Sequence, residues 1–224
     1  MNLARGLDRR FVWMRKKAFF YRFAWMTRWL LFTAFLPTGM VKAMGHRFTL
    51  LGPETPIGAF FEAMYQTGLF WRFIGVTQMA AAILIVIPVL SHLGAAVFLP
   101  IILNIFIITV GLQFTGTPFI TGPMLLAAMF LVFWDYHRFR GLLFSEPVDL
   151  RPEMPRHQLD KIEWLGFFLF AAGLSVTFMG TRSLLSTSAI PYTLGASTLG
   201  GFLALGRFLS QMKTRSLHAR KAMS

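Results

Sequence analysis

A stretch of forty residues without a formal charge, from residue 73 to residue 112, constrains this chain more than any other feature. It contains two apolar segments, 73–90 and 93–112, separated only by Ser91 and His92. About 20 apolar residues, each rising about 1.5 Å along a helix, cross a bilayer core of about 30 Å. Backbone amides need hydrogen-bond partners inside lipid, so each segment is either a helix or part of a closed barrel. Because the run AAAILIVI at 80–87 lacks the alternation of a barrel strand, we predict a transmembrane helical hairpin.

The composition of the whole chain agrees with a membrane protein that crosses the bilayer several times. Of its 224 residues, 55% are hydrophobic and 14% are charged, which is too apolar for a soluble domain of this size. Cysteine is absent, so disulfides, thiolate metal sites and CxxC redox motifs are excluded. The spacing of histidines and carboxylates predicts no metal site, and no catalytic residue is predicted.

Four further apolar runs predict membrane helices at roughly 25–44, 122–138, 164–180 and 190–209. The segment 45–68 is too polar to span. Thr55 and Pro56 predict the start of a short helix within it, and Gly68 predicts its end. We expect this helix to be amphipathic and to lie on the outer face. The predicted fold class is therefore all-α, a polytopic membrane bundle of six transmembrane helices.

The predicted domain organisation follows from these runs and from the charges between them. Residues 1–22 form a basic, aromatic interfacial segment, and residues 23–143 form a four-helix membrane core that includes the outer segment 45–68. Residues 144–161 form a cytoplasmic loop. Residues 162–224 contain two additional transmembrane helices and a basic tail.

The basic residues predict the orientation of the chain. The net charge is +13, and eighteen of the 22 Lys and Arg residues lie in the amino-terminal flank through residue 28, the loop 138–161 or the tail from residue 207. The positive-inside rule then places both termini in the cytoplasm. The expected partners are the lipid bilayer and, at the basic amino terminus, anionic lipids. Nucleic acid is not an expected partner.

Two short motifs resemble the DoxX-like family of small bacterial membrane proteins. The first is FLPTGMVK at 35–42, an apolar run that ends in Gly-x-x-Lys, and the second is GVTQMAAA at 75–82. In that family a glutamate precedes the small residues of the second motif. Gln78 stands near this position, and the departure weakens a proton-coupled role. The resemblance covers roughly residues 25–143 and implies a four-helix core.

Polar side chains within the predicted helices are the candidate functional residues. Gln78 and Asn104 each lie nine residues below the outer end of the hairpin, at a depth of about 14 Å by helical rise. Together with Thr38 and Lys42 on the first helix, we expect them to line a polar cavity beneath the segment 45–68. The alternative is an interhelical hydrogen bond that only fixes packing, worth about 0.6 kcal/mol.

The DoxX-like resemblance implies an accessory, partner-binding membrane subunit more readily than an enzyme. Some members of the family are associated with thiosulfate:quinone oxidoreductase or with oxidative-stress complexes. The alternatives are a small-molecule transporter or a quinone-reactive oxidoreductase subunit. No cofactor is predicted, although a quinone is compatible with the last alternative. A protein partner or a homo-oligomer is compatible with the accessory role.

Overall fold

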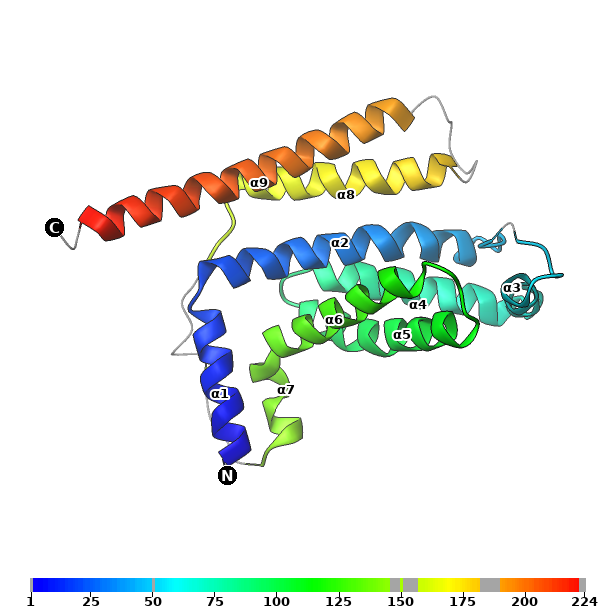
Figure 1. Cartoon of the computed structure of the whole chain (residues 1–224), viewed down its shortest axis with the longest axis horizontal. Helices are drawn as coiled ribbons and strands as arrows, with labels where there is room; N and C mark the ends of the chain where they lie inside the picture. The colour runs from blue at the N-terminus through cyan, green and yellow to red at the C-terminus, as the bar shows by residue number, and fades with distance from the viewer. Residues whose placement is uncertain (1, 50, 146–149, 151–156, 182–189, 222–224) are drawn as a thin grey trace. The chain divides into compact units, whose positions relative to one another are not determined.

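The computed structural model describes residues 2–49, 51–145, 150, 157–181 and 190–221, and every regular element among them is a helix (Figure 1). The predicted all-α class is therefore confirmed. The chain divides into two compact units, Met1–Pro155 and Arg156–Ser224. The helices of the first unit are α1 (Asn2–Arg15), α2 (Ala18–Ala43), α3 (Pro56–Gln66), α4 (Leu69–Val86), α5 (Ser91–Gly111), α6 (Pro118–Trp134) and α7 (Tyr136–Leu143). Those of the second unit are α8 (Lys161–Thr181) and α9 (Ile190–Lys221).

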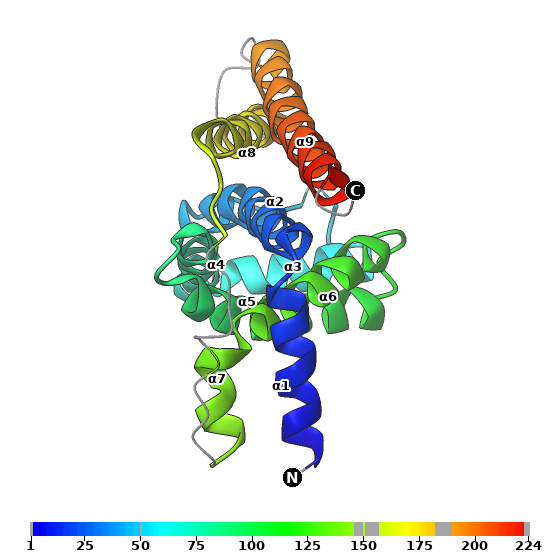
Figure 2. The same cartoon turned by 90° about the vertical axis from the view of Figure 1, so that its left-hand side faces the viewer.

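Helices α2, α4, α5 and α6 form the bundle of the first unit (Figure 1 and Figure 2). The centre of the bundle is apolar: the ring centroids of Phe35 and Phe98 lie 4.0 Å apart, and Ile85, Ile102 and Leu131 are fully buried. In lipid, helices associate through close packing more than through apolar burial. The contacts between backbones are therefore the informative ones.

Helices α2 and α4 pack backbone to backbone at a pair of glycines. A Cβ atom added to Gly39 would lie 2.8 Å from the carbonyl oxygen of Gly75, and one added to Gly75 would lie 2.6 Å from the carbonyl oxygen of Gly39. Only glycine permits this approach. These are the glycines of the two motifs at 35–42 and 75–82. Both motifs thus mark a helix crossing.

The hairpin of α4 and α5 is present, but its turn is longer than the sequence predicted. The first helix was expected to continue to residue 90, whereas α4 ends at Val86. Pro88 is the reason, because proline restricts the preceding residue to extended conformations, and Ile87 has φ −82° and ψ 116°. Gly94 lies close to the backbone of Ile85 across the turn.

The prediction of a single helix over residues 122–138 is wrong. Helix α6 begins earlier, at Pro118, and ends at Trp134, and α7 continues at 80° to it. Two residues at the break form hydrogen bonds to other helices. Asp135 accepts them from Arg28 of α2 and Ser91 of α5, and the hydroxyl of Tyr136 donates one to Asp8 of α1. These hydrogen bonds fix the residues at the bend to the neighbouring helices.

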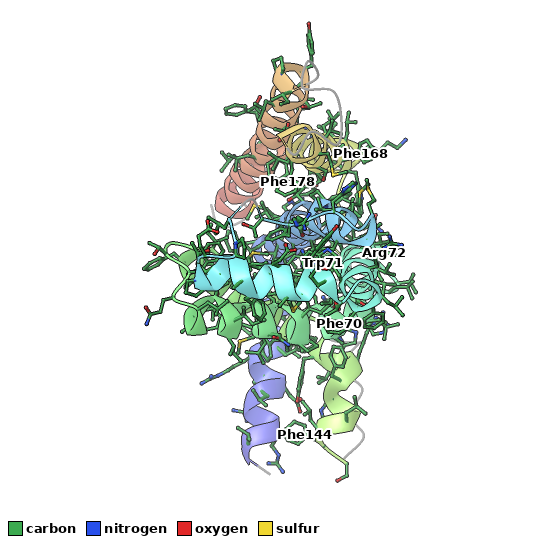
Figure 3. All side chains as sticks on the ribbon, turned by 90° about the vertical axis from the view of Figure 1, so that its right-hand side faces the viewer. Phe70, Trp71, Arg72, Phe144, Phe168 and Phe178 are labelled. Atoms are coloured by element: carbon green, nitrogen blue, oxygen red, sulfur yellow. The ribbon has the colours of Figure 1, made fainter. Side chains whose placement is uncertain are left out.

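The short helix predicted within 45–68 is confirmed as α3. The Oγ1 atom of Thr55 accepts a hydrogen bond from the backbone N–H of Gly58 at 3.0 Å, and Pro56 occupies the first helical position. Gly68 follows the helix with a positive φ of 59°. Figure 3 shows α3 lying across one end of the bundle, with Trp71 beside it. The ring centroids of Phe61 and Tyr65 lie 6.5 and 6.4 Å from that of Trp71, in edge-to-face arrangements.

Helices α1 and α7 leave the bundle at the end opposite α3 and run side by side across its axis (Figure 1). Asp8 of α1 joins them: it accepts hydrogen bonds from the hydroxyl of Tyr136 at 2.9 Å and from Nε and Nη2 of Arg140 at 3.0 and 3.2 Å. Phe11 is fully buried between them, with its ring 5.5 Å from that of Tyr136.

The second unit is an α8–α9 helical hairpin. Asp160 and Glu163 form a reciprocal capping box at the start of α8, through hydrogen bonds of 3.0 and 2.7 Å between side chains and backbone N–H groups. Gly166 and Gly200 bring the two backbones together. The Oγ1 atoms of Thr177 and Thr193 lie 2.8 Å apart across the hairpin.

Three described helices, α4, α5 and α8, are long and apolar enough to cross a membrane. The bent pair α6 and α7 would make a fourth. Helix α2 contains two arginines, Arg22 and Arg28, which lower its hydropathy although both side chains are buried. The protein is thus an all-helical chain with several helices suited to a bilayer.

Candidate functional site

A pocket of about 290 Å³ lies between α3, α4 and α5. This volume is near the lower end of the range for small-molecule sites, roughly 300–1,000 Å³. Its lining is mainly apolar and consists of Met64, Phe70, Phe73, Ile74, Thr77, Gln78, Ile101, Asn104, Ile105 and Ile108.

The spacing of these residues explains why they share one pocket. On α4 they occur at 70, 73, 74, 77 and 78, and on α5 at 101, 104, 105 and 108. Intervals of three and four residues place side chains on one face of a helix. The pocket is therefore the groove between one stripe of α4 and one stripe of α5, and Met64 of α3 closes one end.

Gln78 is the most constrained polar residue of the pocket. Its side chain is 3% exposed, and its Oε1 atom is buried without a hydrogen-bond partner in the described part of the chain. A buried polar atom without a partner costs about 1–3 kcal/mol. Because Gln78 lines the pocket, a rotation of its side chain would let a bound hydroxyl or N–H group supply the missing hydrogen bond.

Asn104 places a second amide in the same pocket, from α5. Unlike Gln78, its side chain is exposed. Gln78 and Asn104 therefore line the same pocket. They differ in access, since Gln78 is enclosed and Asn104 lies at an open position.

Lys42 and Thr38 occupy a different place and do not line this pocket. Thr38 donates its hydroxyl to the backbone oxygen of Ala34 at 2.9 Å. The buried Nζ atom of Lys42 lies 3.2 Å from the backbone oxygen of Thr38, with the ring centroids of Phe48 and Trp71 at 4.1 and 5.6 Å. The structure thus brings together two of the four predicted residues and places Lys42 in an aromatic enclosure.

A buried ionic cluster near the α6–α7 bend was not predicted. Nη2 of Arg28 donates to Oδ2 of Asp135 at 3.1 Å, and their side chains are only 5% and 8% exposed. Ser91 donates to the same carboxylate oxygen at 3.4 Å. The guanidinium of Arg28 also lies 4.7 Å from the ring centroid of Trp25.

The loop before α3 is fixed by an exposed ion pair. Nε and Nη2 of Arg47 donate to the two carboxylate oxygens of Glu62 at 2.8 and 2.9 Å, and Gln66 donates to Glu62 as well. These hydrogen bonds, Arg47 first, lower the pKa of Glu62 to about 2. Glu62 therefore stays ionised across the physiological range. No group of three His, Asp or Glu side chains suited to a metal occurs among the residues searched, which are those the structure describes.

The fold and the pocket define a class: an all-helical protein with several apolar helices that suit a bilayer, and an apolar groove between two of them. No family model matches the chain, and no solved structure matches it. The chain is similar to a protein of Bacillus subtilis (strain 168) described as uncharacterized protein YwoB, with 34% identity over 128 residues. The match covers 54% of this chain and 82% of YwoB, so the chain belongs to the YwoB family.

Proposed function

We propose that this protein is an accessory subunit of the DoxX-like type in the bacterial inner membrane, and that it holds a lipid-soluble molecule for a partner protein. It has six spans, with both termini in the cytoplasm and a DoxX-like four-helix core at roughly 25–143. The grouping of eighteen of the 22 basic residues supports this orientation. The pairing of Arg28 with Asp135 supports α2 as a span, since it neutralises a charge that would otherwise oppose insertion.

The observation that carries the proposed role is the unpartnered carbonyl of Gln78 in the α3–α4–α5 pocket. An amide that served only to join two helices would have its hydrogen bond from the neighbouring helix. The Gln78 oxygen has none, and the residue lines a pocket that lipid-soluble molecules can reach beside the exposed Phe70 and Phe73.

The pocket selects a ligand class by its chemistry. Apolar walls favour a hydrophobic body, and the buried Gln78 oxygen favours a hydroxyl donor. Asn104 can accept or donate a second hydrogen bond. A small hydroxylated ring compound meets these requirements, and a reduced quinone belongs to this class. A redox complex in the membrane would supply such a molecule.

Purification of the full chain in mild detergent tests the proposal, with mass spectrometry of the co-purifying proteins, lipids and quinones. We expect a retained quinone or other hydroxylated lipid, lost in Gln78→Leu and reduced in Asn104→Leu. Gln66→Leu makes the same chemical change outside the pocket and should retain the ligand.

Two results would contradict the proposal. If Gln78→Leu carried the same small molecules as the unchanged protein, the pocket would not be a site. If no protein partner were retained under crosslinking in the native membrane, the accessory role would fail, whatever the pocket holds.

A further inference from the structure

A second pocket lies on α1, away from the groove of Gln78. It has a volume of about 350 Å³, and its walls are Asp8, Arg9, Val12, Trp13, Lys16 and Leu150. Its position is defined by the fold, because α1 and α7 lie across the end of the bundle opposite α3 (Figure 1 and Figure 2). Helices that run across the axis of a membrane bundle at its end lie at the level of the lipid headgroups.

The charge of this pocket is positive. Arg9 and Lys16 both line it, and none of the ion pairs in the described part of the chain includes either. Asp8 is the only acidic residue of α1, and its carboxylate is already bonded to Arg140 and Tyr136. The negative charge of Asp8 is thus neutralised from α7, and two cations remain to face the pocket.

The arrangement of α1 also suits an amphipathic ligand. Arg9 and Trp13 lie four residues apart on α1, and Lys16 directly follows its last residue, so the spacing i, i+4 and i+7 places the three along one stripe. The indole of Trp13 lies between the two cations along this stripe, and 58% of the residue is exposed. Val12 and Leu150 supply an apolar wall. Tryptophan beside basic residues is typical of the boundary between headgroups and acyl chains.

We propose that this pocket binds the phosphate of an anionic phospholipid. Arg9 and Lys16 bind the phosphate oxygens, and Trp13 lies against the glycerol and the first part of the acyl chains. The site holds a lipid at a fixed position on α1, which distinguishes it from a general attraction of the basic segment to the bilayer. This inference is independent of the ligand in the α3–α4–α5 pocket.

Native mass spectrometry of the full chain in detergent, titrated with phosphatidylglycerol, tests the inference. At about 1 kcal/mol for each basic residue near an anionic lipid, the double substitution Arg9→Ala, Lys16→Ala should weaken the tightest binding event about 30-fold. The matched control is Arg5→Ala, Arg10→Ala, which removes the same charge from α1 outside the pocket and should change the affinity less than about threefold. Phosphatidylcholine should not occupy the site.

Three outcomes would overturn the inference. Equal weakening by both double variants would mean that only the total charge of α1 matters. Equal binding of phosphatidylcholine would mean that no anionic headgroup is recognised. Displacement of the lipid by millimolar inorganic phosphate, but not by the same concentration of chloride, would make this a site for the free anion. All variants alter surface residues, and size-exclusion chromatography verifies that each one is folded.

Discussion

At the scale of single residues, this protein contains an ion pair whose two side chains are removed from water. Arg28 and Asp135 are nearly as buried as the apolar centre of the bundle. A buried pair adds little net stability when it is complete, whereas loss of one partner leaves an isolated charge and costs about 3–5 kcal/mol. The pair therefore specifies which faces of α2 and α6 meet.

The Asp135→Asn variant should lose about 3 kcal/mol of stability, because Arg28 keeps its charge without a carboxylate. Unfolding in detergent, followed by circular dichroism, measures this. Asp160→Asn is the matched control, since the partner Arg207 is half exposed and the expected loss is below about 1 kcal/mol. The double variant Arg28→Met, Asp135→Leu should recover most of the lost stability. An Asp135→Asn protein as stable as the unchanged chain would show that the pair is dispensable.

The Arg47–Glu62 pair makes a prediction about pH. The pKa of Glu62 is lowered to about 2 in the folded protein. The ionised carboxylate therefore stabilises the folded state fully above the ordinary pKa of a glutamate, near 4.3, and this contribution is lost as the pH falls towards 2. In Arg47→Ala the pKa of Glu62 should rise towards the ordinary value. Titration of the carboxyl carbon by NMR measures the pKa in both proteins, and Arg72→Ala serves as a control. The same low pKa in Arg47→Ala would exclude Arg47 as the cause.

At the scale of elements, packing depends on the places where two helices come closer than side chains allow. The Gly39–Gly75 crossing of α2 and α4 is one such place, and it lies one helical turn from Gln78. The position of the Gln78 amide therefore depends on this crossing. Gly75 of the motif at 75–82 is explained by this contact between backbones.

Gly75→Ala should separate α2 from α4, because even a methyl group meets the backbone of the neighbouring helix. Overpacking of this kind costs about 1–3 kcal/mol. Gly111→Ala is the matched control, since a Cβ at that position has no atom within 4 Å and should be neutral or slightly stabilising. Thermal unfolding of the two variants in the same detergent compares them. Equal melting temperatures would show that the crossing can relax.

Sequence reasoning succeeded where the signal is local. The Thr55–Pro56 start of α3 depends only on neighbours a few residues away. Sequence reasoning failed where the position of a side chain depends on residues far away in the sequence. No residue near Asp135 in the sequence indicates that its carboxylate bonds to Arg28. Lys42 was misplaced for the same reason, because the position of Phe48 beside it depends on how the loop before α3 folds.

At the scale of the whole molecule, the distribution of basic residues predicts the topology. Reporter fusions at residues 3, 115 and 222 should report cytoplasm, periplasm and cytoplasm in turn, since the positive-inside rule places the basic flanks together. Alkaline phosphatase and green fluorescent protein give complementary signals for the two compartments. A periplasmic signal from either terminus would contradict six spans with both ends inside.

The sequence separation of 107 residues between Arg28 and Asp135 has a consequence for the synthesis and membrane insertion of the protein. At about 5–20 residues per second, a ribosome adds Asp135 about 5–20 s after it has added Arg28. In the proposed topology, α2 must spend that interval beside the insertion machinery with its arginine unpaired, and it can settle in lipid only when α6 arrives. Nascent chains that stop before residue 135 should therefore remain bound to the translocon or be degraded by membrane proteases. Chains that extend past α6 should escape both fates.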